Sequence, residues 1–474
     1  MKKKTDLVKN TAIITIGKIC TQFLSFFLLP LYTSILSTSE YGTVDLLSTY
    51  QLLLLPVVFF QIERALFRFL VDIRLSEEKQ KVLISTTFSF VVWQAIFLCI
   101  IFGVVSLFLH YEYLWNLYFY IIAVAFSSYM LQSSRGLGHN AVYAIGSFII
   151  ATTTIIGNIL FLAVFHLGAK GMLTSYVIGN LIGGLYVAFT LKIYKCINFS
   201  CFSRDRLMEC FRYSIPLIPE NLAWWVMGAS DRIVVSMMMG VAYNGVLSIS
   251  HKFPSVFTAF FMIFYLSWSE SAAIHIQDAD RDEYFGSVIN TTYNLFSSLA
   301  IGIIACLPFV FNIFVPNPDY HGAYQIIPIY MLASMFNVIQ GLYSVVYFGL
   351  KKTRELVKTT ILGAALNLIV CIALIKWIGL YAAALSSVIG YGANAIWRYL
   401  DLKKYVNAKL KVVYVVSSMI AGSFVCFCYY TESNVLKIIG FLGAVIYAVA
   451  INKELLKNVI STLGKSRMRF LHKE

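Results

Sequence analysis

The chain has 474 residues, of which 59% are hydrophobic and 13% are charged, and its formal net charge is +14. With a mean hydropathy of +0.76, this composition excludes an ordinary soluble fold, because soluble domains average about 45–50% apolar and about 25% charged residues. The basic residues are dispersed over short segments and do not gather on one face, so we expect no nucleic-acid partner.

Apolar runs of about 20 residues recur along the whole chain, and each is long enough to cross a bilayer as a helix. They lack the period-two alternation of a membrane β-barrel, so we expect an all-α polytopic membrane protein. The first run, of about 26 residues, is too long for a cleaved signal peptide. The sequence predicts fourteen spans, at residues 11–36, 44–67, 82–109, 114–134, 141–165, 171–194, 213–240, 243–268, 287–311, 323–349, 356–376, 379–399, 412–430 and 434–452.

The lysines and arginines fall almost entirely on one side of this arrangement. With both termini on that side, 31 of the 37 basic residues lie there, three lie within spans, and only Lys170, Lys376 and Lys437 lie on the other side. Cytoplasmic loops of membrane proteins carry such an excess of Lys and Arg. The sequence therefore predicts a multi-pass protein of the cell (cytoplasmic or inner) membrane with both termini in the cytoplasm.

An internal repeat organises the spans. Two segments share an Asn, an apolar run, a turn that ends in Gly, and a second Gly thirteen residues later, and a further pair of glycines matches at nearly the same offset. Transporters often contain such repeats. We predict six-helix lobes at 1–195 and 213–405, a cytoplasmic linker at 196–212, and two additional helices with a basic cytoplasmic tail at 406–474. The matched residues are Asn158 with Asn367, Gly171 with Gly379, Gly184 with Gly392, and Gly42 with Gly245.

The segments between the spans are too short for a nucleotide-binding domain, since none exceeds about 20 residues. The nine cysteines include no C-x-x-C pair, so we expect no metal site and no cofactor. Any transport would then use an ion gradient, the membrane potential or the gradient of the substrate itself.

The stretch LPLYTSILSTSEYG, the paired Asn and Gly pattern and the fourteen-span layout resemble the polysaccharide-biosynthesis flippases of the multidrug/oligosaccharidyl-lipid/polysaccharide (MOP) exporter superfamily. The resemblance implies two six-helix lobes around a central cavity that opens alternately to either side. It also implies a substrate, an undecaprenyl-diphosphate-linked oligosaccharide, which is moved from the inner to the outer leaflet for O-antigen, capsule or another surface polysaccharide. A polymerase and assembly proteins would be partners.

Asp231 and Arg232 stand side by side within the apolar run 213–240. Charge in hydrocarbon costs about 2.5–3.5 kcal/mol per residue on insertion scales. Adjacent residues of a helix do not face each other, so each of these two needs another partner or a hydrated cavity. Asn221, Trp225, Gly228 and Arg232 share one stripe of this helix.

Further polar residues lie in the predicted spans 1, 2, 7 and 8, all of which contain proline, and transporters tend to build their sites from interrupted helices. A diphosphate needs a surplus of bases, so we predict a substrate cavity. Other roles are possible for these residues: the basic side chains could form structural ion pairs or snorkel to the membrane surface. The tryptophans could pack in the core, and Glu270 could cap its helix. The cavity residues are Lys18, Gln22, Arg64, Trp224, Trp225, Arg232 and Lys252; Glu63, Glu220, Asp231 and Glu270 are structural partners or carriers of coupling H+ or Na+.

Two other functions remain as alternatives. A cation-coupled drug or metabolite exporter of the same superfamily would favour an acidic cavity, whereas the predicted cavity is basic. A membrane glycosyltransferase, polymerase or ligase usually carries a large outer loop with catalytic residues, and here the outer loops have about ten residues or fewer. We therefore expect a transporter and not an enzyme.

Overall fold

The computed structural model describes residues 26–350 and 352–457. This part of the chain is helical and contains no strand, with α-helices α2 to α17 joined by short 3-10 and π segments. The predicted spans that fall in it are helical over most of their length, and the first predicted span is described only at its end, α2 (Leu29–Ile35). The expectation of an all-α polytopic membrane protein is confirmed.

Eleven helices of the described part are long and apolar enough to cross a membrane. Two predicted spans, α10 and α15, are not among these eleven, since buried polar side chains such as Asp231 and Arg398 lower their hydropathy. Such side chains inside a bundle mark the positions where a membrane protein builds polar networks.

The internal contacts divide the chain into two compact units, Met1–Ser248 and Ile249–Glu474. The division falls within one helix, α11 (Val241–His275), which belongs to both units. The spatial division therefore differs from the predicted boundary at 196–212, and the seventh predicted span belongs to the first unit. The six-plus-six repeat stays a prediction about the sequence.

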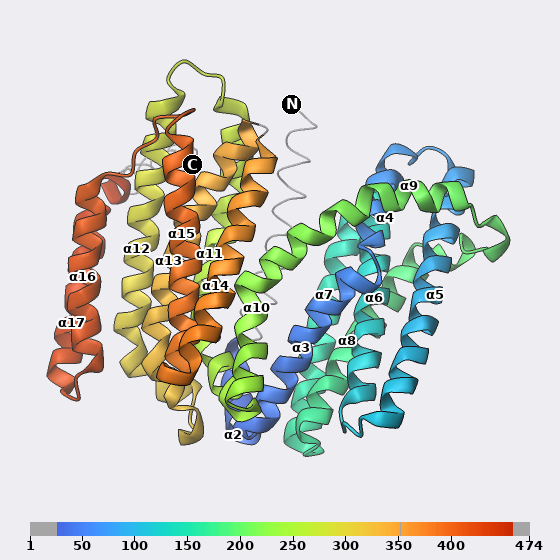
Figure 1. Cartoon of the computed structure of the whole chain (residues 1–474), viewed down its shortest axis with the longest axis horizontal. Coiled ribbons are helices and arrows are strands. Elements are labelled where there is room, and N and C mark those ends of the chain that lie inside the picture. The colour runs from blue at the N-terminus through green and yellow to red at the C-terminus, as the bar shows by residue number, and fades with distance from the viewer. Residues whose placement is uncertain (1–25, 351, 458–474) are drawn as a thin grey trace, which may run out of the picture. The chain divides into compact units, whose positions relative to one another are not determined.

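The first unit is a helical bundle in which α8 packs against α6 and α7, and α10 packs along α3. The helix α9 begins within the predicted linker 196–212. It packs on α4 and α5 and leads into α10 through a short 3-10 segment that contains Pro216 (Figure 1). The helices of this unit are α2, α3 (Thr38–Val58), α4 (Ile62–Asp72), α5 (Glu77–Phe108), α6 (Leu114–Gly136), α7 (Asn140–Asn158) with a π segment (Ile159–Val164), α8 (Gly168–Thr190), α9 (Arg204–Ser214) and α10 (Ile218–Met238).

The second predicted span, 44–67, was expected as one helix, and that expectation is wrong. The hydrogen-bond ladder stops after Val58, and two non-glycine residues, Phe60 (φ 51°) and Gln61 (φ 52°), adopt the left-handed conformation before α4 begins. Each such residue costs about 1–3 kcal/mol and persists only where its surroundings fix it. Here the Phe60 ring packs against Phe90 and Phe211, with centroids 5.8 and 5.6 Å away.

The second unit has its core where α15 packs against α13 and α14, while α16 and α17 pack on α12. Capping serine Ser433 begins α17 one turn after α16 ends, which is why the two predicted spans there have nearly the observed bounds. Its helices are the rest of α11, α12 (Arg281–Phe314), α13 (Gly322–Gly349), α14 (Thr353–Ile378), α15 (Leu380–Leu402), α16 (Val412–Tyr430) and α17 (Asn434–Ile451).

Arg398 lies near the end of the predicted span 379–399, in α15, and is fully buried in this core. Its guanidinium donates to the hydroxyls of Thr359 (3.0 Å) and Thr360 (2.9 Å) and to oxygens of Gln340 and Ser344. A buried cation is tolerated when its donors are all satisfied. These bonds tie α13, α14 and α15 together.

Candidate functional site

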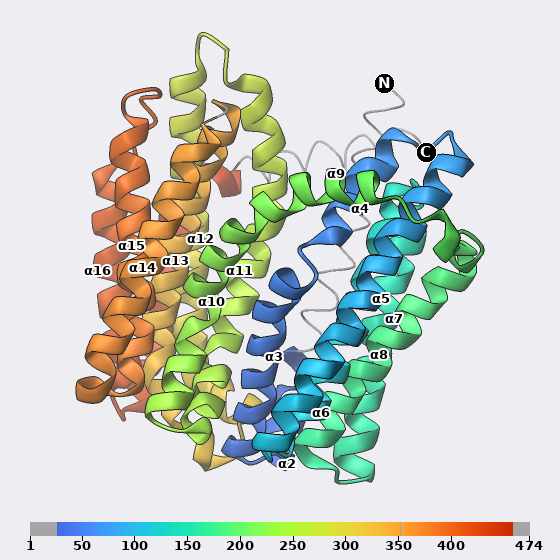
Figure 2. The same cartoon turned by 45° about the vertical axis from the view of Figure 1, so that its right-hand side comes forward.

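A line of polar contacts joins α3 and α4 to α10 in the first unit. We call it the polar seam, and its members are Asp45, Thr49, Gln61 and Arg64 on the first side and Asn221, Trp225, Arg232 and Asn244 on the second. The two views show α3 and α10 running side by side (Figures 1 and 2). The predicted stripe of α10 thus faces another helix, and three of its members make contacts across the seam.

An ion pair lies at one end of the seam. Arg232 Nε is 3.0 Å from Asp45 Oδ2, and each of the two side chains is only 17% exposed. Asn244, at the start of α11, donates its amide hydrogens to the Gly42 carbonyl at 2.9 Å and towards Asp45 Oδ2 at 3.4 Å. The Asp45 carboxylate therefore contacts both the Arg232 guanidinium and the Asn244 amide. These contacts hold α3 to α10 and to the first turn of α11.

Two glycines bring the backbones together beside this ion pair. A Cβ atom on Gly42 would lie 2.0 Å from the Val241 carbonyl oxygen, and one on Gly245 would lie 2.0 Å from the Thr38 carbonyl oxygen. No larger residue fits at such an approach without moving a helix. Gly42 and Gly245 are the pair that the internal repeat matches.

At the other end of the seam, three polar side chains meet at the break between α3 and α4. The Asn221 amide donates to Gln61 Oε1 at 2.8 Å, and Arg64 Nη2 donates to Asn221 Oδ1 at 3.3 Å. Gln61 is buried and Arg64 is exposed. Among the described residues no carboxylate lies within ion-pair distance of Arg64, so its side-chain partner there is the neutral Asn221 amide oxygen.

Trp225 lies between the two ends, where its indole Nε1–H donates to the Thr49 carbonyl at 3.1 Å. Thr49 is buried and its own hydroxyl donates back to the Asp45 carbonyl. The contact orients the Trp225 ring against α3. Its neighbour Trp224 is 41% exposed.

The structure brings together three of the predicted cavity residues, Arg64, Trp225 and Arg232. Lys18 and Gln22 lie outside the described residues. Lys252 and Glu270 belong to the second unit and lie on α11, where Lys252 is half-buried and Glu270 is exposed. Of the predicted acids in the first unit, Glu63 and Glu220 are half-buried, and Asp231 is buried with its Oδ1 accepting the Arg232 backbone N–H at 2.9 Å.

Sequence reasoning missed Asp45 and Asn244, whereas Gln61 was among the polar residues noted at the end of the second predicted span. An acid inside the apolar run 44–67 is a signal that was available for Asp45, because such a residue is costly without a partner. Asn244 gives no comparable local signal. The contact of Arg232 with Asp45 is the structural ion pair that the sequence analysis kept as an alternative to substrate binding.

Comparison with known proteins agrees with this architecture. A family model described as polysaccharide biosynthesis protein matches residues 7–253, slightly more than half of the chain and all of the polar seam. The chain belongs to this family. The polysaccharide biosynthesis family is a flippase family of the MOP superfamily. Among curated protein sequences, none matches the chain significantly.

Solved structures share the fold at low sequence identity. The lipid II flippase MurJ in an inward closed conformation aligns with a TM-score of 0.67 at 15% identity, over 95% of this chain and 100% of that one. An inward-facing multidrug resistance MATE family transporter of the MOP superfamily aligns with a TM-score of 0.70 at 12% identity, over 81% of this chain and 95% of that one. These likenesses show the MOP fold of this polysaccharide biosynthesis protein.

Proposed function

We propose that this protein translocates undecaprenyl-diphosphate-linked oligosaccharide units from the inner to the outer leaflet of the cell membrane, by alternating access, for surface polysaccharide synthesis. Membership of a flippase family supports the transport class. The observation that carries the substrate class is Arg64, an exposed guanidinium without a carboxylate partner among the described residues, which donates to the Asn221 amide oxygen at a helix break. A planar guanidinium is suited to bidentate binding of a phosphate.

The ion pair at the other end of the seam has a different role in this proposal. Arg232 and Asp45 hold α10 against α3 while no substrate is bound, and a diphosphate competes with Asp45 for the guanidinium. Their partial exposure, 17% for each side chain, leaves room for this exchange of anions. Lys18 and Lys252 add positive charge, Gln22 and the tryptophans contact the glycan, and the acids Glu63, Glu220, Asp231 and Glu270 balance charge or carry a coupling H+ or Na+.

The wider setting follows from the same proposal. Both termini and the basic segments lie in the cytoplasm, so the substrate is taken up from the inner leaflet of the inner membrane. A polysaccharide polymerase and assembly proteins receive the flipped units. The protein supplies binding and a conformational change, and it carries out no chemical step as an enzyme.

The test is deletion of the gene in its own host, followed by analysis of surface glycan and lipid-linked intermediates. We expect surface polymer to disappear while complete undecaprenyl-linked repeat units accumulate on the cytoplasmic side. Complementation with the Arg232→Ala or Lys252→Ala variant should not restore polymer at normal protein level, and Arg232→Lys should restore part of it. Unchanged glycan together with new sensitivity to cationic dyes would instead indicate a cation-coupled drug or metabolite exporter.

A further inference from the structure

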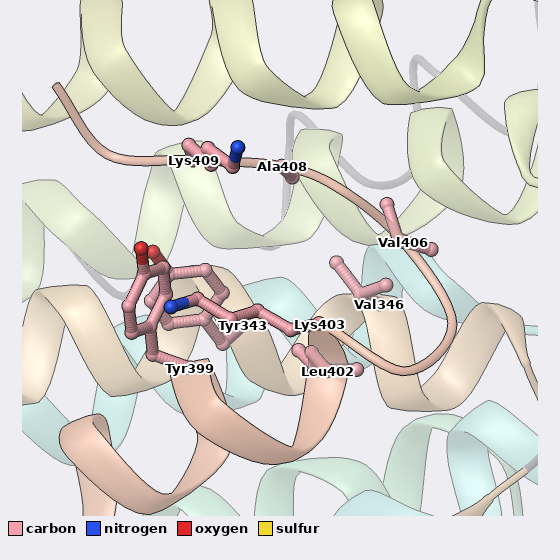
Figure 3. A pocket seen from close by; sticks show the side chains of 8 residues that line it. All are labelled: Tyr343, Val346, Tyr399, Leu402, Lys403, Val406, Ala408 and Lys409. Atoms are coloured by element: carbon pink, nitrogen blue, oxygen red, sulfur yellow. The ribbon is translucent and has the colours of Figure 1, made fainter.

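A pocket lies at the end of α15, within the second unit and away from the polar seam. Its lining combines two tyrosines, two lysines and four apolar residues. The lining residues are Tyr343, Val346, Tyr399, Leu402, Lys403, Val406, Ala408 and Lys409 (Figure 3).

One polar atom in this pocket is unsatisfied. The Tyr343 side chain is 2% exposed, and its hydroxyl finds no hydrogen-bond partner among the described residues. Buried hydroxyl groups are nearly always hydrogen-bonded, and leaving one unpaired costs about 1–3 kcal/mol. The Tyr343 and Tyr399 rings are neighbours, with centroids 5.8 Å apart, and both hydroxyls point the same way in Figure 3. A ligand that accepts a hydrogen bond would satisfy the Tyr343 group.

The charge of the pocket points to an anionic ligand. The Lys403 ammonium lies 4.2 Å from the centroid of the Tyr399 ring, and Lys409 is exposed on the opposite wall. Within the part of the chain that the structure describes, neither lysine forms an ion pair. By contrast, Lys404, on the same linker but outside the pocket, pairs with Asp401 at 2.9 Å.

The wall that carries Lys409 is held in place by the bundle beneath it. Asn290 of α12 donates to the Lys409 carbonyl at 2.8 Å and accepts from the Lys411 backbone N–H at 2.8 Å. Arg281 donates to the Tyr405 carbonyl at 3.1 Å. The backbone of the linker is thus fixed on both sides of the pocket, at Tyr405 and at Lys409.

We infer that this pocket binds the phosphate of an anionic phospholipid. The Tyr343 hydroxyl donates to a phosphate oxygen, Lys403 and Lys409 neutralise the charge, and Val346, Leu402 and Val406 contact the apolar part of the lipid. The pocket lies at the end of a predicted span, which is the depth of lipid headgroups, and basic pockets between membrane helices on the cytoplasmic side are known to bind acidic lipids. This site does not depend on the proposed translocation function.

The experiment measures binding of short-chain dioctanoyl phosphatidylglycerol to the purified full-length protein in detergent, by the shift in melting temperature as the lipid is titrated. The probes for comparison are dioctanoyl phosphatidylcholine, which has no net charge, and inorganic phosphate. We expect saturable stabilisation by phosphatidylglycerol alone. Equal stabilisation by phosphatidylcholine, or by inorganic phosphate, would overturn an anionic-lipid site.

Substitutions in the pocket test whether the lipid binds there. Tyr343→Phe keeps the ring, so it should fold normally, and it should weaken phosphatidylglycerol binding about tenfold, as expected for loss of one hydrogen bond to a charged group. The double variant Lys403→Gln/Lys409→Gln should weaken binding further. Its control, Lys404→Gln/Lys411→Gln, removes the same charge from the same linker outside the pocket and should bind like the wild type. Equal losses in the two double variants would mean general electrostatic attraction and would reject the pocket.

Discussion

Two arginines of this protein, Arg398 and Arg64, lie in different environments. Arg398 is fully buried and satisfied by neutral oxygens from two other helices. Arg64 is exposed, and within the described part of the chain its side chain makes one hydrogen bond, to the Asn221 amide oxygen. A guanidinium whose donors are all used is structural, whereas one with free donors can bind an anion. The distinction assigns different roles to two arginines that composition cannot tell apart.

Arg64 should therefore be sensitive to substitution in the transport assay. Arg64→Ala should reduce surface polymer about tenfold or more in the complemented deletion host, since a hydrogen bond to a charged group contributes about 1.5–3 kcal/mol. Arg64→Lys should retain part of the activity, because it keeps the charge but not the bidentate geometry.

Arg68 provides the matched control for this measurement. It lies one turn further along α4, is similarly exposed, and pairs with Asp72 at 2.6 Å. Exposed pairs of this kind contribute about 0–1 kcal/mol, so Arg68→Ala should leave polymer unchanged. Normal polymer in the Arg64→Ala strain would remove Arg64 from the mechanism.

The ion pair of Arg232 and Asp45 should show energetic coupling. Asp45→Ala and Arg232→Ala should each lower the melting temperature of the purified protein, and the double variant should lose less than the sum of the two, because each single change leaves a partly buried charge without its partner. For residues in contact, coupling of about 0.5–3 kcal/mol is usual. Strictly additive shifts would show that the pair does not hold α10 to α3.

At the scale of elements, the close approach of α3 to the start of α11 depends on glycine. Gly42→Ala would place a Cβ atom 2.0 Å from the Val241 carbonyl, which is backbone and cannot rotate away. We expect this variant to unfold at a markedly lower temperature and to lose activity. The measurements are the melting temperature of the purified protein and the fraction that elutes as a single monodisperse peak in size-exclusion chromatography.

Gly228 is the control for that substitution. It also lies within a helix, α10, but no atom comes within 4 Å of a Cβ built on it. Gly228→Ala should be neutral or stabilising, since Ala is favoured over Gly in a helix interior by about 0.5–1 kcal/mol. If both glycine variants behaved alike, the tight packing of α3 on α11 would not be what matters.

The elements also show which parts of the structure the sequence predicts. Helix positions follow from apolar runs, and the stripe of Asn221, Trp225 and Arg232 follows from helical periodicity. The break at Phe60 and Gln61 does not, because neither residue is a glycine and the nearest signal is Pro56. Contacts between helices, such as that of Gln61 with Asn221, join residues far apart in the chain and leave no local pattern. The fold was thus more predictable than the site.

At the scale of the whole molecule, the predicted orientation can be tested with single cysteines. Cys201 is partly accessible in the segment before α9, which the charge distribution places in the cytoplasm, and Glu432 is exposed in the turn between α16 and α17, on the predicted outer side. In a cysteine-free background, a membrane-impermeant maleimide should label Glu432→Cys in intact cells and restored Cys201 only after permeabilisation. The reverse pattern would invert the topology.

Cys210 serves as the negative control in that experiment. It is buried in α9, and burial raises the pKa of its thiol to about 12. Because the pKa is raised, the reactive thiolate is nearly absent at pH 7–8 and would form only as the pH approaches 12. Restored Cys210 should therefore stay unlabelled with or without permeabilisation, and labelling would mean that α9 leaves its packing surface.

The interruption between α3 and α4 has a mechanical consequence. A continuous helix transmits a tilt at one end to the other as a rigid lever. With two left-handed residues in its place, the ladder of backbone hydrogen bonds is cut, and a few dihedral angles absorb any reorientation. In the proposed mechanism, the segment that carries Arg64 swings while the segment that carries Asp45 stays anchored. We therefore expect that anion binding at Arg64 does not by itself break the ion pair of Asp45 with Arg232.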